Sequence, residues 1–317
     1  MPASQIVDST SAADTLGVLL QCPRCRIVMD TFRCSGCDFE IRERGAVWFA
    51  LPPERIAYYA RFIGDYERIR AAEGRGSNGD RFYLALPYQD LSGRNSKQWK
   101  IRARSFDHLL RRVLQPSLPP GAKILDLGAG NGWMSFRLAL AGYTPFAVDL
   151  LTNSNDGLGA AEHYRSFLPH MFSCFQAEMT DLPFADGQFD VVLFNASFHY
   201  VESAEEAVRE ALRVVAKGGM VIICDTPWYA HEASGHQMVE ERRAAFLKAY
   251  GTASDSLASV EFLTTDRLRE TEKRLNIRWT AHAPSYGIQW AMRPLMAKLR
   301  RKREPSRFRI YVTQKSA

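Results

Sequence analysis

Four of the six cysteines form two C-x-x-C pairs, Cys22 with Cys25 and Cys34 with Cys37, separated by eight residues. A C-x-x-C turn directs two thiolates at one point, and two such turns supply the four sulfur ligands of a structural zinc site. Because protein sulfur fills all four positions, no site remains for water or substrate, and we expect a structural Zn2+ here. Two disulfides conflict with the expected reducing compartment, and a redox pair lacks the surrounding βαβ pattern.

A glycine-rich turn at residues 128–132 (GAGNG) follows the short apolar strand expected at 123–127 and precedes a helix that begins near Trp133. Strand, glycine turn and helix open a doubly wound α/β domain, which binds a nucleotide at this turn. A dinucleotide fingerprint needs a glycine where Trp133 stands, and the Asp126 carboxylate beside the turn would repel a pyrophosphate. The turn therefore favours a ligand with a cationic group and no phosphate over NAD or FAD.

The pattern D-x-G-x-G-x-G, formed by Asp126, Gly128, Gly130 and Gly132, resembles the first motif of the class I, seven-stranded S-adenosylmethionine-dependent methyltransferases. The resemblance covers roughly residues 120–225 and includes the run LPFADGQFD. It implies an α/β fold with a doubly wound, mostly parallel seven-stranded sheet, helices on both faces and a hairpin formed by the last two strands. It also implies S-adenosyl-L-methionine as cofactor.

Further candidate contacts follow the strand ends. Asp149 stands nineteen residues past Gly130 at the end of a second strand, where a carboxylate can accept both ribose hydroxyls. By the resemblance, Glu178 occupies the place of an acid near the adenine amine, with the Met179 backbone beside it. The residues predicted to bind the cofactor are Asp126, Gly128, Gly130, Asn131, Gly132, Asp149, Leu150, Glu178, Met179 and Asn195.

A candidate general base lies after the fourth strand, which is expected at residues 190–194. Ligands of open α/β sheets bind at the carboxyl ends of strands, and His199 is the base best placed there if the acceptor must lose a proton. A histidine packed at a loop edge is the alternative interpretation. The weaker candidates for this role are Tyr200, Tyr229, His231 and His236.

Two hypotheses remain for the molecule that accepts the methyl group. Residues 195–198 (NASF) do not form the Asn/Asp-Pro-Pro-Tyr/Phe loop of adenine amino-methylating enzymes, and no Pro-Cys stands at the fourth strand for a covalent route to cytosine. A small molecule or biosynthetic intermediate, methylated on oxygen or nitrogen, is favoured. Structured RNA is the alternative, because a four-cysteine ribbon before a class I domain resembles rRNA guanine methyltransferases with a zinc module. Basic residues 298–303 could then contact phosphates. A different hypothesis concerns the whole protein, which could be a catalytically inactive scaffold that binds the cofactor.

The length of 317 residues predicts one large domain with appendages. We expect a flexible polar tail at 1–20, a zinc ribbon at 21–53, a helical linker or lid at 54–118 and a methyltransferase domain at 119–317. Insertions at about 226–275 and 284–306 are expected to shape the acceptor pocket.

Composition excludes several classes of protein. Hydrophobic residues make up 46% and charged residues 24%, which is typical of a globular chain. The net charge of +6 comes from local basic clusters, so it does not by itself indicate a nucleic-acid binder. No stretch approaches the roughly 20 apolar residues of a membrane span, the N-terminus lacks the basic start of a secretory signal, and sparse cysteine favours a cytoplasmic location.

Overall fold

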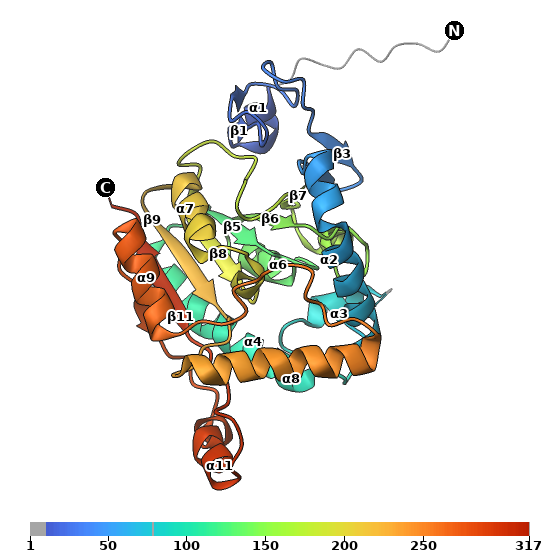
Figure 1. Ribbon diagram of the computed structural model, residues 1–317. Helices are drawn as coiled ribbons and strands as arrows, with labels where there is room; N and C mark the ends of the chain where they lie inside the picture. Colours follow the sequence, from blue (N-terminus) through green and yellow to red (C-terminus); the bar gives the residue numbers. More distant parts are fainter. Residues whose placement is uncertain (1–10, 78, 317) are drawn as a thin grey trace.

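The computed structural model describes residues 11–77 and 79–316, and its centre is one nine-stranded sheet in the order β10-β11-β9-β8-β5-β6-β7-β4-β3 (Figure 1). The strands are β3 (Arg42–Arg44), β4 (Val47–Phe49), β5 (Lys123–Leu127), β6 (Thr144–Asp149), β7 (Ser173–Gln176), β8 (Phe189–Asn195), β9 (Val215–Cys224), β10 (Thr280–His282) and β11 (Ile310–Gln314).

The pairing is mostly parallel, as expected. Strands β4, β7, β6, β5, β8 and β9 run parallel to one another, whereas β3 is antiparallel to β4 and β11 is antiparallel to both β9 and β10. The predicted α/β class and the hairpin of the last two strands are therefore confirmed. The sheet differs from the expected seven strands because the β3–β4 hairpin, which lies inside the segment predicted as zinc ribbon, pairs with β7.

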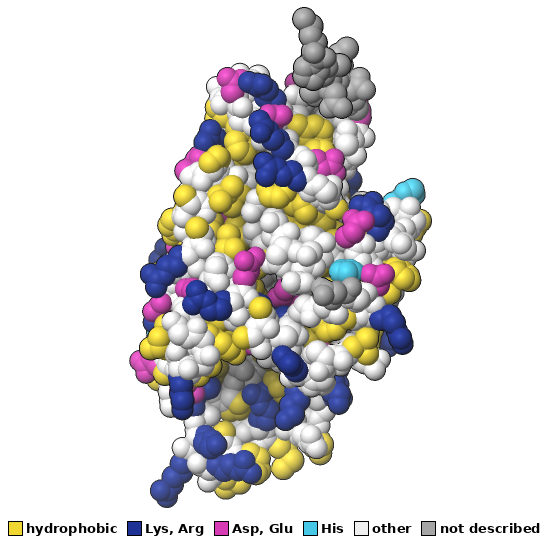
Figure 2. Space-filling view, turned by 90° about the vertical axis from the view of Figure 1, so that its right-hand side faces the viewer, with side chains coloured by type: hydrophobic (Ala, Val, Ile, Leu, Met, Phe, Trp, Pro, Cys, Tyr) yellow, Lys and Arg dark blue, Asp and Glu magenta, His cyan; other side chains and the backbone are white. Residues whose placement is uncertain are grey.

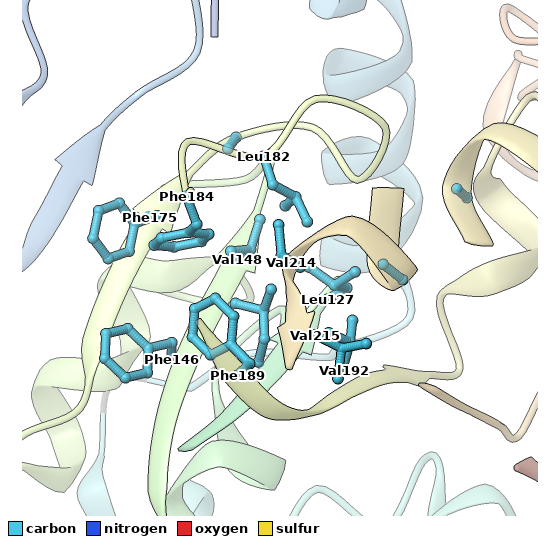
Figure 3. Close-up of a cluster of buried hydrophobic side chains, with 14 of the residues drawn as sticks. Leu127, Phe146, Val148, Phe175, Leu182, Phe184, Phe189, Val192, Val214 and Val215 are labelled. Carbon is cyan, nitrogen blue, oxygen red and sulfur yellow. The ribbon is translucent and has the colours of Figure 1, made fainter. Parts of the chain in front are cut away.

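Helices cover both faces of the sheet, and neighbouring residues of one strand belong to different apolar clusters. Leu125 and Leu127 of β5 pack in one cluster with α7 (Ala204–Val214) and α9 (Thr265–Leu275), part of which is shown in Figure 3. Ile124 of the same strand packs in the other cluster with α4 (Ser96–Leu109) and α6 (Trp133–Leu140). Burial on both faces explains the near-continuous apolar strands of the sequence.

Several helices remain besides these four. They are α2 (Pro53–Ala72), α3 (Asp80–Ala85), a π-helical turn (Leu110–Leu114) with α5 (Gln115–Ser117), two 3-10 helices (Leu158–Phe167 and Phe198–Tyr200), α8 (Glu232–Tyr250), α10 (Ile288–Ala291) and α11 (Arg293–Leu299). Of these, α3, the π-helical turn and the first 3-10 helix pack in the same apolar cluster as α4 and α6. No helix of the described part of the chain is long and apolar enough to cross a membrane.

The N-terminal module consists of α1 (Ala12–Leu16) and the antiparallel hairpin of β1 (Leu20–Gln21) and β2 (Val28–Met29). It lies against the main domain, because the Gln21 amide donates to the Pro183 carbonyl at 3.1 Å and the Ala185 amide donates to the Leu19 carbonyl at 2.9 Å. Part of the segment predicted as a flexible tail, residues 12–20, is thus folded into this module, while residues 1–10 lie outside the described residues.

Candidate functional site

A cavity of about 350 Å3 lies at the carboxyl ends of β5, β6, β7 and β8, beneath helix α2. We call it the first cavity. Eight of the ten residues predicted to bind the cofactor line it: Gly128, Gly130, Asn131, Asp149, Leu150, Glu178, Met179 and Asn195. They come from four different strand ends, which the parallel order of the sheet brings to one edge.

The glycine turn approaches the neighbouring strand end closely. A Cβ atom on Gly128 would lie 2.3 Å from the Ser197 Cβ and 2.8 Å from the Met179 Cε, and the φ of Gly128 is +73°. Ser197 is itself fixed, because its hydroxyl donates to the Leu127 carbonyl. Only glycine fits at residue 128, because Ser197 and Met179 occupy the space that a side chain would need.

Asp149 is fixed by the turn that precedes it. The Gly130 amide donates to Asp149 Oδ2 at 2.8 Å, and the Leu151 amide donates to Oδ1 at 2.8 Å. Burial nevertheless raises the pKa of Asp149 to about 6. Both oxygens of an ionised carboxylate have further lone pairs, so the side chain can still accept hydrogen bonds from a ligand.

Two of the predicted cofactor residues do not line the first cavity. The Asp126 carboxylate is fully buried below the turn, where it accepts a hydrogen bond from the Ser135 hydroxyl at 2.9 Å, and burial raises its pKa to about 7. Gly132, with φ +74°, precedes the first residue of α6, and a Cβ there would lie 3.2 Å from the Phe172 ring. Their positions give both residues a role in shaping the turn.

Glu178 has partners that the sequence did not indicate. Arg55 of α2 forms a bidentate ion pair with it at 2.7 and 2.6 Å, and the Tyr59 hydroxyl donates to it at 2.8 Å. Glu178 is 5% exposed, so this ion pair closes one end of the first cavity. The pair also fastens α2 over the strand ends.

Helix α2 contributes side chains to the cavity wall that the sequence marked only as part of a lid. Arg70 forms an ion pair with Asp156, and the Asn131 amide donates to the same carboxylate at 3.4 Å. The ring of Tyr66 lies 5.5 Å from that of Tyr200, edge to face. These contacts join the helix to the loops after β6 and β8, and no motif in the sequence pointed to them.

A second cavity of about 300 Å3 adjoins the first. The two share five lining residues: Tyr66, Arg70, Arg102, Ala196 and Tyr200. Its other lining residues come from α2 and the loop after it, α4, the 3-10 helix after β8, the end of β9, α8, the loop before α9 and Phe308. The wall thus includes parts of the predicted insertion at 226–275.

The second cavity holds buried polar atoms that have no hydrogen-bond partner. They are Arg75 Nη1, Arg242 Nε, His199 Nδ1 and Asp225 Oδ2. Within residues 11–77 and 79–316, no residue that lines only the first cavity has such an atom. Because unpaired buried polar groups are costly, these four atoms mark a place where a ligand can supply the missing partners.

His199 and Asp225 differ in their capacity to take a proton. Burial, with Arg242 and Arg102 nearby, lowers the pKa of His199 to about 3, so its imidazole is neutral and weakly basic at neutral pH. Burial raises the pKa of Asp225 to about 6. Asp225 stands at the end of β9 with one oxygen accepting from the Ser105 hydroxyl. Of the weaker candidates, Tyr200 lines both cavities, whereas Tyr229, His231 and His236 line neither.

The four N-terminal cysteines come together. Their sulfur atoms all lie within 4.8 Å of one another, with 3.5 Å between Cys22 and Cys37 and 3.4 Å between Cys25 and Cys34. These separations are much longer than a disulfide bond and suit four ligands around one metal ion. Cys22 and Cys25 lie in the turn of the β1–β2 hairpin, and Cys34 and Cys37 lie in the loop after β2. None of the four lines either cavity.

Comparison with known proteins agrees with this geometry. Residues 125–223 match the model of a family described as "Methyltransferase domain". The demethylmenaquinone methyltransferase of Beutenbergia cavernae is 30% identical over 155 residues, which are 47% of this chain and 62% of that protein. The malonyl-[acyl-carrier protein] O-methyltransferase of Buchnera aphidicola is 30% identical over 151 residues, 46% of this chain and 51% of that protein. The chain thus spans only 51% to 62% of the length of these two relatives.

A solved structure resembles most of the fold. It belongs to a complex between the Trm112 methyltransferase activator of Haloferax volcanii and a methyltransferase, and its chain aligns with a TM-score of 0.51 at 16% identity. The alignment covers 76% of this chain and all of that chain (100%). At this identity the likeness concerns the fold alone.

Proposed function

We propose that the protein transfers a methyl group from S-adenosylmethionine to an oxygen or nitrogen atom of a small molecule, because residues 125–223 match the methyltransferase-domain model and lie in a mostly parallel α/β fold. The observation that carries the proposal is the pair of adjoining cavities at the carboxyl edge of the sheet. One cavity suits the methyl donor and the other suits the acceptor.

The first cavity fits the cofactor. Gly128 and Gly130 line it with backbone that carries no side chain, and Asp149 stands where it can accept hydrogen bonds from ribose hydroxyls. When bound, S-adenosylmethionine would supply a methyl group on a positively charged sulfur. The chain itself would orient this ligand through Asp149, Leu150, Met179 and Asn195, and α2 would exclude water.

The second cavity is assigned to the acceptor. Its lining residues include four guanidinium groups and three carboxylates, those of Arg70, Arg75, Arg102, Arg242, Glu73, Asp225 and Glu261. Arg70, Arg75 and Arg242 have ion-pair partners, whereas Arg102 has none within the described ranges. An acceptor that presents an anionic group to Arg102 would therefore fit the charge of this cavity. Two curated relatives bear the names of enzymes that act on demethylmenaquinone and on malonyl-[acyl-carrier protein], which favours a biosynthetic intermediate.

Asp225 is a better general base than His199 in this arrangement. A catalytic base works best when its pKa is close to the working pH, and the pKa of about 6 for Asp225 satisfies this far better than the value of about 3 for His199. Asp225 Oδ2 is buried and unpartnered, so a hydroxyl or amine of the acceptor can donate to it. His199 would instead position the acceptor through a hydrogen bond from its neutral ring.

The four cysteines are proposed to bind Zn2+ as a structural ion. Sulfur is a preferred ligand of zinc, and the compact arrangement of the four sulfur atoms suits tetrahedral coordination. The ion would stabilise the N-terminal module, whose two-stranded hairpin is too small to be stable by itself.

The test combines cofactor binding with transfer of label. Isothermal titration should show that both S-adenosylmethionine and S-adenosylhomocysteine bind, and the absence of both would discard the proposal. Incubation of a cell extract with methyl-labelled cofactor should place the label in the small-molecule fraction, whereas label in RNA would reverse the choice of acceptor.

Once an acceptor is found, the base can be tested. The variant D225N should lower kcat at pH 7 by about a hundredfold while S-adenosylhomocysteine still binds. The variant H199Q should retain most of its kcat and raise KM. The opposite pattern would return the base to His199.

A further inference from the structure

The segment formed by α10, α11 and residues 300–303 extends from the lower end of the molecule, beyond α8 (Figure 1). Five of its large apolar side chains are exposed: Ile288 (77%), Met292 (46%), Leu295 (55%), Met296 (37%) and Leu299 (70%). Ile288 begins α10, whereas the other four lie on α11 or at its N-cap, three or four residues apart except for the adjacent pair Leu295 and Met296. Intervals of three and four residues place side chains on one face of a helix. They make up a third of the large apolar side chains that are exposed in the described chain.

The same segment is basic throughout. Arg293, Lys298, Arg300, Arg301 and Lys302 stand among or directly after the apolar residues, and no Asp or Glu occurs from residue 285 to residue 303. Figure 2 shows hydrophobic and basic side chains gathered at this lower end of the molecule. Arg303 is paired with Glu241, but the four exposed cations Lys298, Arg300, Arg301 and Lys302 have no acidic partner among the described residues. The surface therefore combines apolar area with an unbalanced positive charge.

Aromatic contacts hold the segment to the body from its inner side. The ring of Trp290 stacks on that of Phe308 with centroids 5.7 Å apart, and Arg293 lies over the Trp290 ring at 3.7 Å. The Tyr286 hydroxyl is hydrogen-bonded to that of Ser105 at 2.8 Å. The exposed apolar face is thus presented outward by a segment that is attached firmly at its base.

We propose that this surface, residues 288–302, docks on a membrane that contains anionic lipids. An amphipathic helix with a basic polar side inserts its apolar side chains at the lipid headgroups, and anionic lipids attract its cations. The proposal is independent of the methyltransferase activity. It also bears on the second cavity, because Phe308 lines that cavity and stacks on Trp290, so docking would bring its wall close to the lipid surface.

Two other occupants suit the surface less well. RNA would pair with the cations but would leave the exposed apolar side chains in water. A second copy of the chain in a twofold dimer would cover the apolar residues but would oppose two basic surfaces to each other. An anionic bilayer matches both properties, and it is therefore the occupant to which the observations lead.

Vesicle flotation of the full-length protein tests the proposal. Vesicles of phosphatidylcholine with 30 mol% phosphatidylglycerol should carry the protein, whereas pure phosphatidylcholine vesicles should bind it at least tenfold less. Added salt at 0.5 M should also weaken binding to the anionic vesicles, because it screens the attraction between the lysine and arginine side chains and the lipid.

Three variants separate the contributions. The double variant L295E/L299E should lose vesicle binding by more than tenfold, and the triple variant K298Q/R300Q/R301Q should lose it to a similar extent. The matched control is L247E, because Leu247 is a 58% exposed leucine on α8, outside the segment. This control should bind vesicles as the unchanged protein does, and all three variants should bind S-adenosylhomocysteine with unchanged affinity.

Three results would overturn the proposal. The first is equal binding of the L295E/L299E variant and the unchanged protein to anionic vesicles. The second is tight binding to a structured RNA hairpin that K298Q/R300Q/R301Q abolishes and L295E/L299E does not. The third is a stable dimer, measured by light scattering, that L295E/L299E dissociates. Because cofactor titration is measured separately, failure of docking and failure of the proposed activity are distinguishable.

Discussion

The two cavities at the carboxyl edge of the sheet are adjacent but differ in how their polar groups are satisfied. In the first cavity, Asp149 accepts two backbone amides and Glu178 holds Arg55 and Tyr59. In the second, four buried polar atoms have no partner, and Arg102, which lines both cavities, has no counter-ion in the part of the chain that the structure describes. A site whose polar groups are already paired within the protein suits a ligand that is the same in every reaction cycle, such as a cofactor. Unpaired buried polar groups lower the stability of the folded protein, and they favour a ligand that supplies the missing partners.

The largest expected effect concerns the shape of the first cavity. The variant G128A places a Cβ 2.3 Å from that of Ser197, so we expect a loss of ~3 kcal/mol in unfolding free energy. Cofactor affinity should fall by more than tenfold. The control G130A, whose Cβ would meet nothing closer than 3.4 Å, should lose only ~1 kcal/mol. Urea unfolding and isothermal titration measure both, and equal losses would show that the contact with Ser197 does not matter.

The next effect tests the contrast in charge pairing. Removing Arg70 leaves Asp156 buried without its partner, and we expect R70M to lower the unfolding free energy by ~2 kcal/mol. Arg102 is desolvated by burial and faces Arg70 and Arg75, which lowers its pKa. The variant R102M should therefore leave the unfolding free energy unchanged or raise it by up to ~1 kcal/mol. R104M, an exposed position on the same helix, is the control. A large loss of stability in R102M would contradict the absence of a counter-ion at Arg102.

The smallest effect concerns Asp149. The variant D149A should weaken binding of S-adenosylhomocysteine by about tenfold, ~1.4 kcal/mol. The pKa of Asp149 is about 6 in the folded protein, above the ordinary 3.8, so the carboxylate gains a proton as the pH falls below about 6. Because only the ionised form accepts hydrogen bonds with both oxygens, cofactor affinity should decline below this pH. D149N should abolish that decline, and D266N, on the exposed side of α9, should not. Unchanged affinity in D149A would move the ribose site elsewhere.

The first cavity could be predicted from the sequence because its residues follow strands directly. Asp149, Met179 and Asn195 each stand within three residues of a strand end, and the parallel order of the sheet brings such ends together. The sequence did not reveal that Glu178 pairs with Arg55, which lies 123 positions earlier on a helix. Pairing between distant elements depends on how α2 packs, and packing leaves no local pattern.

Most residues of the second cavity could not be predicted from the sequence, for the same reason. Arg75, Arg102 and Arg242 look like ordinary charges in polar segments, and only the folded chain surrounds them with protein. His199 was found because it follows β8, but its weak basicity depends on burial and on the nearby Arg242, neither of which the sequence states. Asp225 directly follows the next strand, β9, but no motif around it predicts a role in catalysis.

The pairing of β4 with β7 has a consequence for any shortened form of the protein. Strand β4 caps the side of the sheet on which β7 would otherwise be outermost, with Val47 opposite Cys174 and Phe49 opposite Gln176. Removal of residues 1–50 would leave β7 as an unpaired, apolar edge strand, which can pair with other chains and aggregate. The β3–β4 hairpin therefore protects the edge of β7 from pairing with other chains.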